Sequence, residues 1–219
     1  MPQMLFMDRV SKRYDSDQEA LSEVTLRVDQ GEMVFVTGHS GAGKSTLLKL
    51  IALMERPDKG RVVVGQTDLG KLAARHVPLH RRRIGVIFQD HRLLADRTVF
   101  DNVALPLVVS GYSRRDIGRR VRAALDKVGL LNRERQYPVA LSTGEQQRVG
   151  IARAVVHKPP LLLADEPTGN LDPDLSREIM HLFEAFNQVG VTVLVVSHDL
   201  GLVKRLAHRT VRLEHGRVI

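Results

Sequence analysis

Short apolar, β-branched runs alternate along the chain with stretches in which apolar residues recur at helical spacing. Five such runs predict buried strands: Met33–Thr37, Val62–Val64, Ile84–Phe88, Leu161–Asp165 and Val191–Val196. The last two runs are apolar at almost every position, which is typical of strands covered on both faces. This alternation predicts an α/β fold with a mostly parallel core sheet flanked by helices.

Strand signals are missing from the middle of the chain, where helical patterns follow one another. Three patterns occupy this interval: Val99–Val109, Arg114–Val128 and Thr143–His157. We therefore expect one domain over residues 1–219. Its core would be formed by residues 1–88 and 159–219, and a helical subdomain at residues 89–158 would interrupt that core.

Composition narrows the class of protein. The 219 residues are 43% hydrophobic and 26% charged, which is ordinary for a globular domain and excludes a disordered chain or a coiled-coil rod. Cysteine is absent, so a disulfide framework, a thiolate metal site and a cysteine nucleophile are excluded. No run reaches the roughly 18 apolar residues of a membrane span, and Met1–Val10 lacks the apolar core of a signal peptide. We therefore expect any membrane anchor to come from a partner.

The chain is basic, with 33 Lys and Arg against 25 Asp and Glu, a formal net charge of +8. Arginine accounts for 25 of the basic residues, and it clusters at Arg81–Arg83, Arg114–Arg115 and Arg119–Arg120. Such clusters fit a nucleic-acid footprint, an anionic lipid surface or an ordinary solvated face. Charge alone leaves these three interpretations open.

A phosphate-binding motif stands between the Met33–Thr37 strand and a helical pattern at Ser45–Leu53. The motif has the form G-x-x-x-x-G-K-[ST] and consists of Gly38, His39, Ser40, Gly41, Ala42, Gly43, Lys44 and Ser45. Its glycines let the backbone curl around phosphates, and its N–H groups supply positive potential. Lys44 is expected to reach the β- and γ-phosphates, and the Ser45 hydroxyl to ligate Mg²⁺.

Two acidic residues end the predicted strand at Leu161–Asp165. A carboxylate at the end of a buried strand is costly unless it is paired or lies near a metal. Asp165 is therefore expected to hold Mg²⁺, directly or through water. Glu166 would leave the strand end facing the γ-phosphate, where a carboxylate positions and polarises water.

Four further features follow the phosphate motif along the chain. They are the run Leu141–Arg148 before a helix, the run Asp165–Asp172, and Gln89 and His198, each after a strand. Together they resemble the signature motif, the extended Walker B motif with its D-loop, the Q-loop and the switch histidine of ATP-binding-cassette (ABC) ATPases. The resemblance covers nearly the whole chain. It implies a P-loop ABC nucleotide-binding domain that hydrolyses ATP, with an N-terminal antiparallel β portion and a signature-bearing helical subdomain.

The family resemblance also implies roles for individual residues. The catalytic residues would be Glu166, Gln89 and His198, and the Mg²⁺ ligands would be Ser45, Gln89 and Asp165. The nucleotide contacts would be Tyr14, Gly38, His39, Ser40, Gly41, Ala42, Gly43, Lys44, Ser45, Thr46, Ser142 and Gly144. In the family, an aromatic residue at the position of Tyr14 stacks on adenine.

The signature run has a structural interpretation of its own. Ser142 and Glu145 form the S-x-x-E pattern of a capping box, which predicts a helix beginning after Ser142. In the ABC family this helix end faces the ATP bound by the other subunit, so the resemblance implies an ATP-dependent head-to-tail homodimer. Thr143 stands where the family pattern has glycine, and its side chain could crowd the γ-phosphate or weaken the dimer.

Several runs around these motifs resemble the cell-division branch of the ABC family. They include Thr37–Leu50, Ile87–His91, Asp96–Val99, Ala124–Leu131 and Val149–Val156. The resemblance implies pairing with the membrane protein FtsX and a peripheral place on the cytoplasmic face of the bacterial inner membrane. There, ATP-driven conformational change would regulate cell-wall hydrolysis.

The alternatives are ATPase subunits for lipoprotein release or for macrolide or peptide export, which share the Asp165–Asp172 run. Nucleic acid is an unexpected partner, because DNA-repair members carry long coiled coils and ribosome-acting members carry two cassettes. The resemblance places the docking groove of the membrane partner beside residues 90–109. Leu93, Leu94 and Val99 are its candidate apolar contacts.

Overall fold

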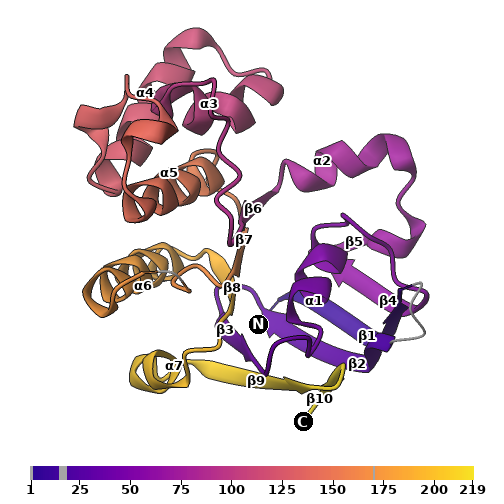
Figure 1. The fold of residues 1–219 in the computed structure, drawn as a ribbon. Helices are drawn as coiled ribbons and strands as arrows, with labels where there is room; N and C mark the ends of the chain where they lie inside the picture. The colour runs from indigo at the N-terminus through magenta and orange to yellow at the C-terminus, as the bar shows by residue number, and fades with distance from the viewer. Residues whose placement is uncertain (1, 15–18, 170) are drawn as a thin grey trace.

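The computed structural model describes residues 2–14, 19–169 and 171–219. Figure 1 shows two sheets in the lower part of the molecule and a group of helices set apart above them. Asn170, which belongs to the predicted D-loop, lies outside the described residues.

The larger sheet has six strands in the order β10-β9-β3-β8-β7-β6. The strands are β3 (Met33–Thr37), β6 (Ile84–Ile87), β7 (Leu161–Asp165), β8 (Thr192–Val196), β9 (Arg209–Glu214) and β10 (Arg217–Val218). All neighbours are parallel except β9 and β10, which form an antiparallel hairpin. The predicted mostly parallel core sheet is confirmed, and the carboxyl ends of β3, β7 and β8 meet at one edge.

The second sheet is antiparallel and has the order β2-β1-β4-β5. Its strands are β1 (Gln3–Arg13), β2 (Glu19–Asp29), β4 (Lys59–Val64) and β5 (Thr67–Asp68). It forms the antiparallel β portion that the family resemblance implies. Of its strands, only part of β4 was predicted from the apolar pattern.

Seven α-helices occur in the described parts of the chain. They are α1 (Lys44–Ile51), α2 (Val77–Arg81), α3 (Val99–Val109), α4 (Arg114–Lys127), α5 (Thr143–Val155), α6 (Pro173–Gln188) and α7 (Leu200–Leu206). Short 3₁₀ turns occupy Leu69–Lys71, Ala74–His76, Leu131–Arg133 and Pro138–Ala140. Helices α3, α4 and α5 fill the interval in which strand signals are missing, and Figure 1 shows them packed together.

Helices begin where side chains cap them. Thr98, Ser113 and Asp172 each accept a hydrogen bond from a backbone N–H in the first turn of the helix that follows. The predicted capping box is confirmed, because Ser142 accepts from the N–H of Glu145 and Glu145 accepts from the N–H of Ser142. These caps fix where α3 to α6 begin.

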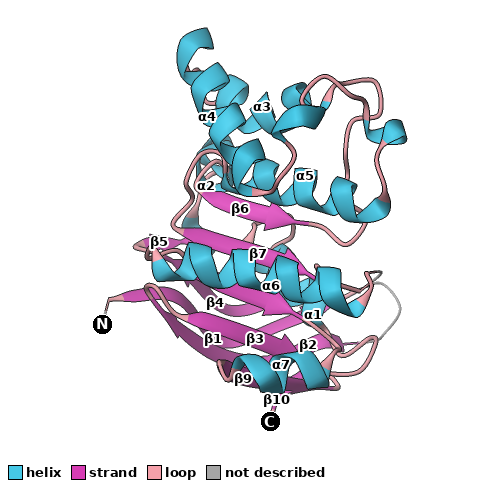
Figure 2. Cartoon of the chain, turned by 90° about the vertical axis from the view of Figure 1, so that its left-hand side faces the viewer, coloured by secondary structure: helices cyan, strands magenta, loops and turns pink. Residues whose placement is uncertain are grey.

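The core sheet is covered on both faces by separate apolar clusters. On one side, Val34 and Val36 of β3 pack with residues of α1 and of the antiparallel sheet. On the other side, Phe35 packs with residues of α3 to α7, and Figure 2 shows α6 and α7 lying across this face. Alternate residues of β7 and β8 divide between the same two clusters, so the predicted burial of these strands on both faces is confirmed.

Two helices end two residues earlier than their apolar pattern predicts. Helix α1 ends at Ile51 because Leu53 takes a left-handed backbone (φ 51°), and α5 ends at Val155 before Lys158 (φ 56°). A left-handed residue cannot continue a right-handed helix. Among the helices described, none combines the length and the apolar character that a membrane span needs.

Candidate active site

The phosphate motif forms a tight loop between β3 and α1. Gly38 and Gly43 have positive φ values of 149° and 102°. A Cβ at Gly38 would overlap the carbonyl oxygen of Leu213 in β9, and one at Gly43 would overlap that of Ala20 in β2. Only glycine fits both positions, because backbone from two other strands lies against the loop.

Lys44 closes this loop from the inside. Its side chain is buried, and Nζ donates to the carbonyl oxygens of Gly38 at 2.8 Å and His39 at 2.9 Å. The ammonium therefore lies at the centre of the curled backbone, beside the N–H groups at the start of α1. This arrangement concentrates positive potential at one point, as a phosphate-binding loop requires.

Ser45 and Asp165 meet beside the loop, although 120 residues separate them in sequence. Ser45 Oγ donates to Asp165 Oδ1 at 3.2 Å. Burial raises the pKa of Asp165, and the Ser45 hydrogen bond and the charge of Lys44 oppose this rise. A half-buried carboxylate beside a hydroxyl is a donor set that fits Mg²⁺, which prefers oxygen ligands.

The described residues contain no cluster of three or more acidic, histidine or cysteine side chains able to hold a metal. This agrees with the usual binding of Mg²⁺, which takes one or two protein oxygens and completes its shell with water and phosphate. The pair of Ser45 and Asp165 therefore fits the ion without a larger protein cage.

Glu166 is the centre of a second cluster. Its Oε2 accepts from Gln89 Nε2 at 3.3 Å, and His198 Nδ1 lies 3.3 Å from the same oxygen. Glu166 has a left-handed backbone (φ 46°), and its N–H donates to the carbonyl of Val196. Such backbone strain in a residue without glycine's freedom occurs preferentially at functional sites. The three predicted catalytic residues thus lie at one point, the carboxyl edge of β6, β7 and β8.

The phosphate loop shares one cavity of about 360 Å³ with Gln89 and Glu166. It is lined by Tyr14, Ala20, Ser40, Gly41, Gly43, Lys44, Ser45, Thr46, Gln89 and Glu166. The Tyr14 hydroxyl lies 3.5 Å from Thr46 Oγ1, and partial burial raises the pKa of Tyr14. An aromatic ring, a phosphate loop and a carboxylate therefore surround a single space.

Three predicted nucleotide contacts lie in the loop but outside the lining of this cavity. Gly38 and Ala42 are held against the C-terminal hairpin, and the N–H of Gly216 donates to the carbonyl of Ala42 at 3.2 Å. The exposed His39 ring packs on His215, with 5.0 Å between the ring centroids. These contacts support the shape of the loop from outside.

The signature residues lie elsewhere. Ser142 and Gly144 stand at the start of α5 in the helical group, and neither lines the cavity of the phosphate loop. A Cβ at Gly144 would overlap the Leu175 side chain of α6, so the glycine allows close packing of these helices. Thr143 between them is exposed. Ser142 and Gly144 therefore do not join the other predicted nucleotide contacts within one chain.

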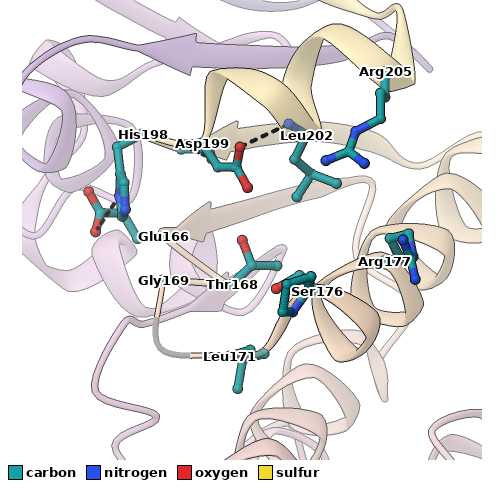
Figure 3. Close-up of a pocket in the computed structure, with 12 residues that line it drawn as sticks. Glu166, Thr168, Gly169, Leu171, Ser176, Arg177, His198, Asp199, Leu202 and Arg205 are labelled. Carbon is teal, nitrogen blue, oxygen red and sulfur yellow. Dashed lines mark hydrogen bonds and ion pairs between the residues drawn. The ribbon is translucent and has the colours of Figure 1, made fainter.

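A second cavity opens on the other side of Glu166. Figure 3 shows Glu166 and His198 on one side of it, Arg177 and Arg205 on the opposite side, and Thr168 between them. The Asp199 carboxylate accepts from the N–H of Leu202 and caps α7 beside it. Glu166 thus lines both the cavity of the phosphate loop and this outer cavity.

Some residues that support the site have no signal in the sequence. Gln147, buried in α5, donates from Nε2 to the carbonyl of Pro167 at 2.7 Å and so ties the signature helix to the segment after Glu166. Leu213 and Leu175 exclude side chains at Gly38 and Gly144. Each contact joins segments far apart in the chain, which no local motif reports.

A groove lies between α2 and β6 on one side and α3 and α5 on the other. Its lining includes Arg81, Arg82, Leu105, Pro106, Val109 and Arg153. The expectation that Val99 is a docking contact is wrong, because Val99 begins α3 and is completely buried in the core. Leu94 is 41% exposed and Leu93 is half-buried.

Comparisons with known proteins agree with this geometry. The sequence profile of the ABC transporter family matches residues 21–169. The cell division ATP-binding protein FtsE of Escherichia coli is 58% identical over 213 residues, which cover 97% of this chain and 96% of the relative. That of Haemophilus influenzae is 49% identical over 214 residues, covering 97% and 98%.

A dimeric ATP-binding cassette, solved in a post-hydrolysis state with ADP and Pi, superimposes with a TM-score of 0.91. It is 35% identical to this chain, and the match covers 98% of this chain and 96% of the cassette. The resemblance derived from the motifs and the predicted fold class are thereby confirmed. The chain belongs to the ABC transporter family and is an ABC-type ATPase.

Proposed function

We propose that this ATPase drives a cell-division complex at the cytoplasmic face of the bacterial inner membrane, where it pairs with an FtsX-type membrane protein. ATP-driven conformational change passes through that partner and regulates cell-wall hydrolysis outside. The supporting observation is the 58% identity, across 97% of the chain, to a protein named for cell division. This similarity favours the cell-division role over lipoprotein release or export.

In the catalytic step, Glu166 positions and polarises the attacking water as the general base. The observation that carries this assignment is the approach of Gln89 and His198 to the same carboxylate oxygen. Two partners on one oxygen fix the direction of the carboxylate and leave its other oxygen for water. A positioned base of this kind typically contributes about 10²–10⁴-fold to the rate.

The phosphate loop binds the nucleotide. Lys44 and the N–H groups of residues 38–46, which include Thr46, hold the phosphates, and Tyr14 stacks on adenine. Ser45, Asp165 and Gln89 hold Mg²⁺, and that ion, when bound, neutralises charge on the phosphates. The fit is supported by the 3.2 Å contact between Ser45 and Asp165.

Ser142 and Gly144 act on the nucleotide of a second copy, in an ATP-dependent head-to-tail homodimer. This arrangement is supported by two observations: neither residue lines the phosphate-loop cavity of its own chain, and the start of a helix such as α5 favours anions. A cassette of the same fold has been solved as a dimer. The chain then acts as one nucleotide-binding domain, with residues 89–158 as the helical subdomain and residues 1–88 and 159–219 as the ATP-binding core.

The membrane partner docks in the groove between α2 and α3. Leu105 and Val109 are 40% and 53% exposed there, beside the guanidinium groups of Arg81 and Arg82. An amphipathic segment with apolar and acidic side chains matches this lining. Lipid attraction to single arginines is worth only about 1 kcal/mol each and is screened by salt, so the groove decides recruitment.

Membrane recruitment in cells tests this proposal. A fluorescent fusion should move from the membrane to the cytosol when the FtsX-type protein is deleted. Leu105→Glu and Val109→Glu should abolish recruitment without abolishing ATP binding, whereas Val189→Glu, at an exposed position after α6, should leave recruitment unchanged. If the isolated protein instead sediments with anionic vesicles in physiological salt, its own basic surface is the anchor and partner docking is wrong.

A further inference from the structure

The loop that follows Gln89 turns through two left-handed residues. His91 has φ 55° and Arg92 has φ 46°, and neither is glycine. Residues in this conformation are strained and persist only where surrounding contacts hold them. The structure therefore has to supply a contact that stabilises this bend.

Arg153 supplies that contact from α5. Its Nη1 donates to the carbonyl of Arg92 at 2.6 Å, and its Nη2 donates to the carbonyl of His91. One guanidinium thus binds two consecutive carbonyl oxygens of the bend. Only arginine presents two donors in a rigid fork, so neither lysine nor an uncharged side chain reproduces this pair.

The contact has an electrostatic cost. Burial lowers the pKa of the Arg153 guanidinium, and the charge of Asp90 partly opposes this effect. An apolar side chain could occupy this half-buried position at a lower cost in free energy. The presence of a cation there is therefore explained by the two carbonyl oxygens that it binds.

The bend is adjacent to the catalytic cluster. His91 is two residues from Gln89, whose amide reaches Glu166, and the N–H of His91 donates to the carbonyl of Phe88 at 3.2 Å. The Arg92 guanidinium stacks 4.2 Å from the centre of the Phe88 ring. A shift of the bend would therefore move the backbone on both sides of Gln89.

We propose that Arg153 is a positioning residue that holds the loop of residues 89–92 so that Gln89 meets the catalytic Glu166. This rests on the proposed role of Glu166 as the base. Arg153 also lines the groove between α2 and α3, so a segment bound in that groove contacts the same side chain that holds the loop. Arg153 thereby joins the docking groove to the reacting carboxylate through one hydrogen-bonded contact.

A double-mutant cycle with Gln89→Ala tests the proposal in the purified full chain. Arg153→Lys keeps the charge and Arg153→Met keeps the length of the stem, but both lose the fork. Each is expected to lower kcat by about tenfold or more, while the ATP Kd changes by less than about twofold, because positioning is lost and binding is kept. Arg119→Lys, an exposed position in α4, is the matched control with unchanged kcat.

In the Gln89→Ala background, Arg153→Lys should lower kcat no further, because its effect passes through Gln89. Additive losses, wild-type kcat in either Arg153 variant, or loss of the fold in both would overturn the proposal. The same assay includes wild type and Glu166→Gln. If Glu166→Gln hydrolyses ATP at the wild-type rate, the proposed function fails; if it does not, additive losses overturn only the role of Arg153.

Discussion

At the scale of one residue, Asp165 shows that a side chain of the candidate site can lower the stability of the folded protein. Burial raises its pKa, so the charged form is less favourable in the fold than in the unfolded chain. For an acid whose folded pKa is raised, stability is greatest below the unfolded pKa and falls as pH rises through the folded value. At neutral pH the free protein therefore carries a carboxylate that favours unfolding, and a cation at this position would offset that cost.

Removing this charge should separate stability from activity. We expect Asp165→Asn to raise the melting temperature of the nucleotide-free protein in EDTA at pH 7, because the amide keeps the shape without the half-buried charge. Mg²⁺-dependent hydrolysis should fall by at least tenfold. Asp126→Asn, at an exposed position on α4, serves as the control. A lower melting temperature for Asp165→Asn would contradict the assignment of Asp165 as a destabilising charge.

The Lys44 ammonium donates to two carbonyls of the phosphate loop, where it can also meet the phosphates of a nucleotide. Lys44→Ala should weaken ATP binding and lower turnover, since a charge-assisted contact to phosphate oxygens is lost. The fold should remain, because glycines and not Lys44 set the shape of the loop. Equilibrium ATP titration and thermal melting measure the two effects, and unchanged turnover would refute the role of Lys44.

At the scale of secondary-structure elements, the phosphate loop is held in place by strands that are distant from it in sequence. The hairpin of β9 and β10 lies against it, with the carbonyl of Leu213 facing Gly38 and the N–H of Gly216 bonded to Ala42. The loop therefore depends on the last strands of the chain as well as on its own motif. Substitutions at the glycines of the loop can therefore test whether packing against β9 constrains it.

Gly38→Ala and Gly41→Ala form a matched pair. Both replace a glycine with positive φ, but a Cβ at Gly41 meets nothing within 4 Å, whereas one at Gly38 overlaps backbone. Gly41→Ala should cost about 1 kcal/mol and Gly38→Ala about 1–3 kcal/mol more, because backbone cannot move as a side chain can. At about 2–4 °C per kcal/mol, melting curves resolve the difference. Equal losses would show that β9 does not constrain the loop.

Prediction from sequence succeeded where a signal is local. The bounds of α3 and β7 follow from short apolar patterns, and the start of α5 follows from the Ser142 and Glu145 capping box. Strand β1 lacks a clean alternation, because its pairing with β2 has several register shifts. Strand β2 alternates between exposed and buried residues from Glu23 to Asp29, and this signal was missed in the prediction from sequence. Val99 was misassigned to the surface because an apolar pattern does not state which face is covered.

The residues of the candidate site also fall into two groups, those that a local sequence pattern identifies and those that it does not. The phosphate motif names Lys44 and Ser45 from spacing alone, and the strand end names Asp165. Gln89 and His198 could be linked to Glu166 only through the family pattern, because parallel strand ends bring them together across long stretches of chain. The contacts of Arg153 were not predicted, since a side chain bonded to carbonyls leaves no trace in sequence.

At the scale of the whole molecule, the proposed function assigns to one chain two incomplete halves of a nucleotide site. The phosphate loop with Glu166 forms one half, and the capped start of α5 with Ser142 forms the other. The outer cavity beside Glu166 is open on the side where the proposed second copy would approach. In the proposed function, two chains in head-to-tail contact complete the site, and hydrolysis then separates them.

The dimer population of Glu166→Gln tests this account most directly. The amide keeps the shape of the side chain but cannot act as the base, so hydrolysis should fall by about 10²–10⁴-fold while ATP still binds. Size-exclusion chromatography with light scattering should then show a dimer in ATP and a monomer in ADP, with Lys44→Ala added to Glu166→Gln as the monomeric control. A Glu166→Gln protein that binds ATP and remains monomeric would contradict the shared site.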